Sequence, residues 1–181
     1  MHTQIVFSFM DADDFRNNLI PYKNIMYRLA KRLLKNTEDA EDAVQDTFAR
    51  LWIKRENLDS GRNLQALTMI TLKNICLDKL KSGNSKILPM IDDENFLPGK
   101  DNPQNQLEKK DIRHKINSII ETMPEPQKMI IHLRDIEGMS NDEVSEIVQM
   151  NKNAVKVALS RARKKLKEEL VKQLEYINYE N

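Results

Sequence analysis

Side chains suited to reading DNA recur at helical spacing in one stretch, NKNAVKVALSRARKKLKEEL, which begins at Asn151. At about 100° of rotation per residue, its apolar residues share one face of a helix and its polar residues share the other. Asn, Ser and Arg bond to base edges, Lys neutralises phosphates, and an outward valine can meet a thymine methyl group. The predicted DNA contacts are Lys152, Asn153, Lys156, Val157, Ser160 and Arg161, with Lys164 outward and Arg163 on the flank.

A second group of chemically capable residues is acidic and lies in the segment 38–52. Glu38 and Asp39 fall in the first turn of a predicted helix, where acids suit the helix dipole. Asp42 and Asp46 lie one turn apart further along, with Gln45 beside them, and the dipole does not account for them. This acidic stripe predicts a docking surface for a basic partner.

The same carboxylates could in principle hold magnesium in a nuclease. Acids on one exposed helix, without converging groups from elsewhere, rarely form a metal site. The three histidines and the single cysteine, Cys76, do not have zinc-ligand spacing. We therefore expect no catalytic residue, no metal and no cofactor, and we expect Cys76 to be a buried free thiol.

The basic stretch is preceded by the signals of a helix-turn-helix. Ser140 and Glu143 have the spacing of a capping box, and Met139 and Val144 that of a hydrophobic staple. Asn151 is a suitable N-cap for the second helix. Two short apolar stripes separated by so tight a turn should bury each other at a steep angle. A basic run can also be a plain solvated face, but the capped turn ahead of it favours DNA reading.

The overall charge bears on how DNA would be bound. Lys and Arg number 29 and Asp and Glu 28, which leaves a net charge of +1 over 181 residues. Phosphate neutralisation supplies much of the affinity of a free-standing DNA-binding protein, so such a protein usually has a basic excess. The near-balance predicts DNA affinity that depends on a larger assembly.

Apolar spacing of three and four residues along most of the chain, with only 4 glycines, predicts an all-α fold. Helices are expected over 11–35, with an interruption at Pro21, then 38–52, 64–81, 103–123 and 126–136, with a polar loop over 55–63. The segment around Asp92, Asp93 and Glu94 lacks apolar periodicity and contains Pro and Gly. We expect two small helical domains, an N-terminal helical bundle (1–83) and a C-terminal helix-turn-helix four-helix domain (105–181), joined by a flexible acidic linker (84–104).

Targeting signals are not evident in the sequence. The N-terminal residues lack the basic start and apolar core of a signal peptide, and no run reaches membrane-spanning length. We expect a soluble, cytoplasmic protein without membrane insertion, whose last residues, 172–181, fray.

With these motifs in view, the sequence resembles the extracytoplasmic-function (ECF) group of bacterial RNA polymerase sigma factors. DAEDAVQDTFARLW (39–52) resembles the region that docks on core polymerase, and NLQALTMITLKNICLDKLK (63–81) the helix that opens and reads the −10 promoter element. The segment 123–166 is similar to the domain that reads the −35 element. Both blocks in this order make the resemblance specific.

The resemblance implies a role for each matching residue. Docking on the basic coiled coil of the largest polymerase subunit would fall to Asp39, Asp42, Gln45 and Asp46. Contacts to the −10 region would come from Asn63, Lys73, Asn74 and Lys79. The −35 contacts would be the six residues of the basic helix named above. Core RNA polymerase and promoter DNA are the implied partners, and many relatives also have an anti-sigma factor.

Three residues depart from the family pattern. Gln149 stands in the turn where the family usually has glycine, which would force it into a left-handed backbone. Ala158 stands where the family often has arginine, which removes one possible DNA contact. Leu67 replaces an aromatic residue that could stack on unpaired bases.

A different class of function, a stand-alone helix-turn-helix transcriptional regulator, would use the same C-terminal motif. In that case the N-terminal bundle would serve for dimerisation or sensing. Such a regulator should bind a specific duplex tightly on its own, whereas a sigma factor should need core polymerase. The balanced charge favours the sigma factor.

Overall fold

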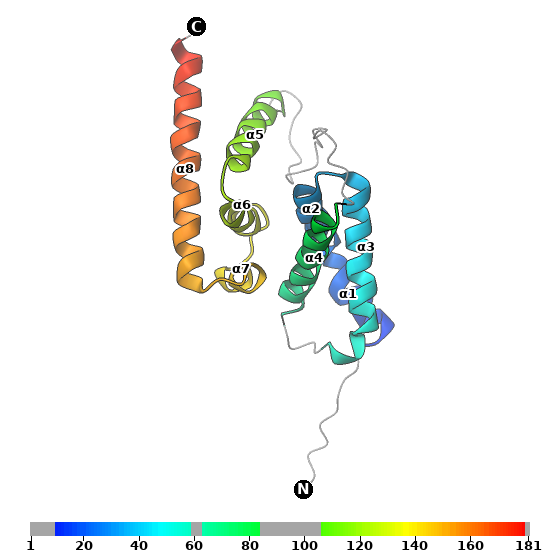
Figure 1. Cartoon of the computed structure of the whole chain (residues 1–181). Coiled ribbons are helices and arrows are strands. Elements are labelled where there is room, and N and C mark those ends of the chain that lie inside the picture. The colour runs from blue at the N-terminus through cyan, green and yellow to red at the C-terminus, as the bar shows by residue number, and fades with distance from the viewer. Residues whose placement is uncertain (1–9, 59–62, 84–105, 180–181) are drawn as a thin grey trace. The chain divides into compact units, whose positions relative to one another are not determined.

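A computed structural model of the chain describes residues 10–58, 63–83 and 106–179, and all regular elements in these ranges are helical (Figure 1). The predicted all-α class is therefore confirmed. The chain forms two compact units, Met1–Asp93 and Glu94–Asn181. The predicted linker 84–104, the helix start at Asn102 and Pro103, and most of the loop before Asn63 lie outside the described residues, so the boundaries 1–83, 84–104 and 105–181 stay a prediction.

The helices of the first unit begin and end at local signals in the sequence. Its elements are α1 (Ala12–Leu19), η1 (Ile20–Tyr22), α2 (Lys23–Leu34), α3 (Thr37–Ile53), η2 (Arg55–Asn57) and α4 (Leu64–Lys81). Pro21 lies in the 3₁₀ turn η1, so the expected interruption separates two helices. Lys35 ends α2 with a left-handed backbone, and the Asn36 carboxamide then accepts a hydrogen bond from the Asp39 amide to start α3.

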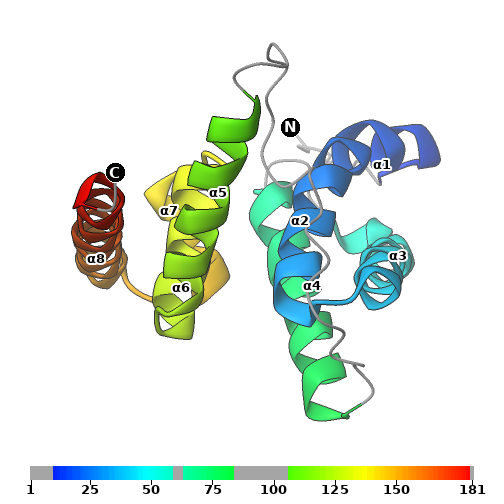
Figure 2. The same ribbon diagram turned by 90° about the horizontal axis from the view of Figure 1, so that it is seen from above.

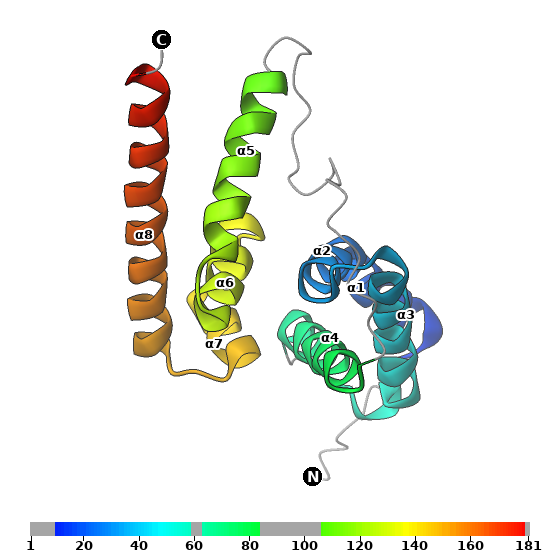
Figure 3. The ribbon, with the colours of Figure 1, turned by 45° about the horizontal axis from the view of Figure 1, so that its top comes forward.

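Helix α4 is the buried centre of the first unit, as its apolar residues on most faces predicted. It packs against α1, α2 and α3, and Figures 2 and 3 show α2, α3 and α4 side by side. Met69, Leu72 and Ile75 of α4 are almost fully buried, and Cys76 is buried as a free thiol, which confirms that expectation. Burial of this much apolar surface is the main force that holds such a bundle together.

The second unit contains α5 (Gln106–Glu121), α6 (Glu125–Ile131), η4 (His132–Ile136), α7 (Asn141–Val148) and α8 (Lys152–Tyr179). Helix α8 packs against α5, α6 and α7, and Figure 1 shows α5 alongside it. The core is formed mainly by Ile120, Ile130, Leu133, Ile147 and Val155. The expected fraying of 172–181 is wrong through Tyr179, because α8 continues to that residue.

The expected single helix over 126–136 is also wrong in part, because its second half is a π-helical turn. The Glu137 amide bonds to the His132 carbonyl at 3.0 Å, five residues back. A buried pair lies at this turn: the His132 Nε2 is 3.4 Å from a Glu137 carboxylate oxygen, and both side chains are at most 1% exposed. Gly138, with a φ of +73°, then ends the segment, because glycine adopts this left-handed backbone without steric cost.

Candidate nucleic-acid interface

The turn between α7 and α8 has the hydrogen bonds of a Schellman motif. The Met150 amide bonds to the Ser145 carbonyl at 3.1 Å and the Gln149 amide to the Glu146 carbonyl at 3.3 Å. Gln149 has a left-handed backbone with a φ of 58°, as expected for a residue in the place of glycine. The Ser145 hydroxyl also donates to the Met150 carbonyl. The angle between the two helices is thus set by backbone bonds.

Both helices of the motif begin with the predicted caps. The Glu143 amide donates to the Ser140 hydroxyl at 3.2 Å, and the Ser140 amide donates to the Glu143 carboxylate at 2.8 Å, which completes the capping box. The Ala154 amide donates to the Asn151 side chain at 2.8 Å. These bonds fix where α8 starts, and hence which side chains project from its first turns.

The predicted DNA-reading face of α8 is exposed. Val155, Leu159 and Ala162 are buried against the rest of the unit, whereas the opposite face is open and Val157 is 49% exposed. About half of the Val157 side chain is therefore open to a ligand. All six residues predicted from the sequence are exposed: Lys152, Asn153, Lys156, Val157, Ser160 and Arg161.

Two flanking basic residues of α8 have acidic partners within the unit. The Lys152 ammonium is 2.9 Å from the Asp142 carboxylate on α7. Arg163, which we expected on the phosphate-binding flank, instead donates two hydrogen bonds to Asp135 of η4, from Nε at 2.9 Å and from Nη2 at 2.5 Å. The Asp135 hydrogen bond raises the pKa of Arg163 above its ordinary value. Sequence spacing could not show this partner, because it lies on another element.

The acidic stripe of α3 lies on the surface. Asp42, Gln45 and Asp46 are exposed and Asp39 is half-buried, so all four predicted docking residues line one accessible side of the helix. The Asp42 carboxylate lies 3.7 Å from the Lys79 ammonium of α4. Trp52 and Ile53 follow at the end of the same helix and are 39% and 77% exposed.

The four predicted −10 residues have different environments. Asn63 is the N-cap of α4, and its side-chain oxygen accepts a hydrogen bond from the Ala66 amide at 3.1 Å. Asn74 is exposed, and Lys79 is half-buried beside the acidic stripe. Lys73, which we expected to contact the −10 region, is only 8% exposed, because other helices cover α4 at this position, and burial lowers its pKa. A contact from Lys73 to DNA stays a prediction.

Sequence reasoning missed an aromatic cluster beside the acidic stripe. The rings of Phe15 and Trp52 meet edge-to-face with centroids 5.1 Å apart, and the Arg55 guanidinium lies 4.3 Å from the centroid of the Trp52 ring. The signal that could have found it is the three-residue spacing of Trp52 and Arg55 in a helical segment.

Among the described residues, no three His, Cys, Asp or Glu side chains lie close enough together to hold a metal ion. The helices in that part of the chain also include none that is long and apolar enough to cross a membrane.

Comparison with known families assigns both units. Residues 21–86 match the family model for sigma-70 region 2, and residues 113–166 match that for sigma-70 region 4. The first range contains the acidic stripe and α4, and the second contains the helix-turn-helix.

Curated relatives of the chain include several ECF RNA polymerase sigma factors. The chain is 29% identical over 149 residues to ECF RNA polymerase sigma factor SigE of Mycolicibacterium smegmatis, a match covering 81% of this chain and 58% of that relative. It is 23% identical to ECF RNA polymerase sigma factor SigW of Bacillus subtilis, covering 88% and 90% of the two chains. It is 27% identical to ECF RNA polymerase sigma-E factor of Escherichia coli, covering 84% of each.

Two solved structures share the fold. The sigma factor RpoE from Bartonella quintana, determined with the anti-sigma factor NepR, superposes with a TM-score of 0.64 at 24% identity, covering 88% of this chain and 98% of that one. CnrH, determined with the cytosolic domain of CnrY, gives a TM-score of 0.60 at 20% identity, covering 88% and 89%.

A region 2 bundle followed by a region 4 helix-turn-helix defines a two-domain transcription initiation factor. A stand-alone regulator would not account for the match of residues 21–86 to sigma-70 region 2. The chain belongs to the ECF group of sigma factors, which direct RNA polymerase to promoters.

Proposed function

We propose that this chain binds core RNA polymerase through α3, takes it to promoters by reading the −35 element with α8, and holds the −10 element with α4 as the strands part. The observation that carries the proposal is the exposed face of α8, the second helix of the capped helix-turn-helix, which presents six side chains suited to DNA. The protein performs no catalysis in this scheme and acts in the cytoplasm, where bacterial transcription takes place.

At the −35 element, α8 enters the major groove with its first turns. Asn153, Ser160 and Arg161 reach base edges, and Val157 meets a thymine methyl group. Lys152 and Lys156 neutralise phosphates on the same side of the helix. Lys152 exchanges its exposed ion pair with Asp142 for a phosphate, at a small cost because exposed pairs contribute little stability.

At the polymerase, the acidic stripe meets the basic coiled coil of the largest subunit. Asp39, Asp42, Gln45 and Asp46 supply carboxylate and amide oxygens for arginine and lysine partners. Complementary charge of this kind mainly accelerates association and selects the partner. The net charge of the whole chain is only +1, so the chain alone neutralises few phosphates. The remaining affinity for DNA comes from the polymerase.

At the −10 element, α4 presents Asn63, Asn74 and Lys79 to the DNA. Lys73 joins them only if its buried ammonium moves outward when the promoter binds. Leu67 stands where an aromatic residue could stack on unpaired bases, and it packs against the apolar core of the first unit. In this proposal, α4 therefore holds the −10 element through polar contacts.

An anti-sigma factor is the remaining proposed partner. Bartonella quintana RpoE was solved with the anti-sigma factor NepR, and CnrH was solved with the cytosolic domain of CnrY. By analogy, a protein of this kind would hold the chain away from polymerase until a signal releases it.

The decisive experiment is transcription in vitro with purified bacterial core polymerase, with and without this protein, followed by sequencing of the transcripts. We expect a discrete set of start sites that share upstream elements, and tight duplex binding only once core polymerase is added. Tight, specific binding by the protein alone, with no effect on core polymerase, would overturn the proposal and favour a regulator.

A further inference from the structure

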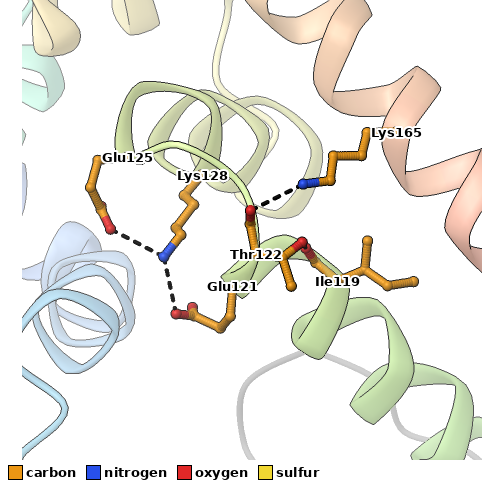
Figure 4. A network of polar contacts seen from close by, with 6 residues as sticks. All are labelled: Ile119, Glu121, Thr122, Glu125, Lys128 and Lys165. Atoms are coloured by element: carbon orange, nitrogen blue, oxygen red, sulfur yellow. Dashed lines mark hydrogen bonds and ion pairs between the residues drawn. The ribbon is translucent and has the colours of Figure 1, made fainter.

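Two basic residues near the middle of α8 make hydrogen bonds to the supporting helices. The Arg163 guanidinium makes a two-pronged contact with Asp135, with Nε and Nη2 at 2.9 and 2.5 Å from its two carboxylate oxygens. The Lys165 ammonium donates to the Thr122 carbonyl at 3.0 Å, at the junction of α5 and α6 (Figure 4). Both contacts join α8 to elements far away in sequence.

The acceptor for Lys165 belongs to a junction that is itself held together. The Lys128 ammonium lies 3.3 Å from Glu121 and 3.1 Å from Glu125, and so ties the end of α5 to the start of α6 (Figure 4). Lys128 is 14% exposed, so its pairs are better shielded than ordinary surface pairs. Lys165 therefore anchors α8 to a fixed point.

These contacts lie on opposite sides of the DNA-reading face. Taking Val157 as its centre and about 100° per residue, Arg163 lies about 120° to one side and Lys165 about 80° to the other. Burial of Val155, Leu159 and Ala162 sets the rotation of α8 coarsely, and polar contacts on both sides limit the small rotations that this packing leaves. A small rotation would shift the outward side chains relative to the bases.

We propose that Arg163 is a positioning residue: through its fork with Asp135 it fixes the rotation of α8, and so decides which side chains read the −35 element, without itself contacting a phosphate. The proposal rests on the proposed function, because it assigns Arg163 a role within that DNA-reading surface. The competing role, a phosphate contact, is what the position of Arg163 in the basic run suggested.

The two roles predict different results for Asp135. If Arg163 binds phosphate, Asp135→Asn removes a repulsive carboxylate and releases the guanidinium, so binding to specific and scrambled duplexes should tighten together and their ratio should stay as in wild type. If Arg163 positions α8, the same change loosens the helix, so the ratio of specific to scrambled binding should fall. The variant Arg163→Lys also distinguishes the two roles. A lysine can contact a phosphate as a point charge, but it cannot form the two-pronged contact that arginine makes with Asp135.

The experiment uses holoenzyme made from core polymerase and the full chain. Its probes are a duplex carrying a promoter mapped from the in vitro transcripts and the same duplex with the −35 element scrambled. Affinities are measured from about 50 to 200 mM salt for wild type, Arg163→Lys, Asp135→Asn and the double variant. Lys164→Gln, which removes an outward-facing lysine, is the matched control for a lost phosphate contact, and circular dichroism checks folding.

For a positioning role we expect Arg163→Lys and Asp135→Asn each to lower the ratio of specific to scrambled binding about tenfold, in the range of a lost base contact. The salt slope should stay as in wild type, and the double variant should be no worse than either single one. Lys164→Gln should reduce both affinities together and lower the slope by about one.

Wild-type selectivity in Arg163→Lys or in Asp135→Asn would overturn the positioning role alone. If Arg163→Lys does not fold, Asp135→Asn by itself decides between the two roles, because only a positioning role lowers the ratio of specific to scrambled binding. A wild-type holoenzyme that does not distinguish the two duplexes would overturn the proposed function as well.

Discussion

The Lys79 ammonium on α4 lies 3.7 Å from the Asp42 carboxylate on α3, so the surfaces proposed for DNA and for polymerase share an ion pair. The Asp42 side chain is 64% exposed and that of Lys79 is 23% exposed, so the pair should contribute less than about 1 kcal/mol to stability. Under the proposed function, polymerase competes with Lys79 for Asp42. A basic group of the polymerase that pairs with Asp42 leaves Lys79 available for DNA.

Reversing the charge of the acidic stripe should separate polymerase binding from folding. We expect Asp42→Lys combined with Asp46→Lys to abolish association with core polymerase in a pull-down, because two attractions become repulsions. Circular dichroism should be unchanged, since both side chains are exposed. Asp13→Lys, at an exposed acid of α1 outside the stripe, is the control and should retain binding. Full retention by the double variant would contradict the docking assignment.

Asn63 can be tested for a role beyond capping. Aspartate caps a helix about as well as asparagine, so Asn63→Asp should keep the bond from the Ala66 amide and change stability by less than about 0.5 kcal/mol. It replaces an amide donor by a negative charge and should therefore weaken opening of the −10 region, measured by permanganate reactivity of unpaired thymines. Asn63→Ala should lose about 1 kcal/mol of stability as well. Normal opening by the aspartate variant would leave Asn63 a cap only.

Glycine at position 149 should make the second unit more stable than glutamine does. Its left-handed backbone, with a φ of 58°, costs a residue with a side chain about 1 kcal/mol that glycine does not lose. Gln149→Gly should thus stabilise the second unit by about that amount, seen as slower hydrogen exchange of α7 amides. Lys35→Gly, at the corresponding position after α2 with a φ of 54°, should do the same for the first unit only. An unchanged exchange rate in both variants would show that neither backbone is strained.

Cys76 should make stability depend on pH in alkaline solution. Burial, only partly offset by Lys79, raises the pKa of its thiol from 9.0 to about 12. Because the folded pKa is the higher one, the contribution is fully present below about pH 9 and is lost as pH rises toward 12. The free energy of unfolding should fall by about 1 kcal/mol between pH 9 and 10 relative to Cys76→Ala. Equal pH profiles for the two proteins would show that the folded thiol is not shielded.

The parts of the structure that could be predicted are those specified by neighbouring residues. Ser140, Glu143 and Asn151 define helix starts within one turn, and the structure shows the bonds they predicted. The bounds of α4 and the exposed face of α8 followed from apolar spacing in the same way. These features need no knowledge of what lies across the fold.

The parts that could not be predicted depend on partners distant in sequence. Arg163 looked like its basic neighbours, and only the fold brings Asp135 to it. Lys73 looked solvated, and only the packing of other helices over α4 buries it. The π-helical turn that begins at His132 includes a buried pair of His132 with Glu137 that no periodicity reveals.

Helix α8 runs for 28 residues without a break, from the first DNA-facing turn to Tyr179. At 1.5 Å per residue it is a rod of roughly 40 Å, and a rod of this kind transmits tilt and torque along its whole length. A force applied at its far end would therefore first load the contacts of Arg163 with Asp135 and of Lys165 with the Thr122 carbonyl. The same element that recognises the promoter is thus braced along its length by the helices beside it.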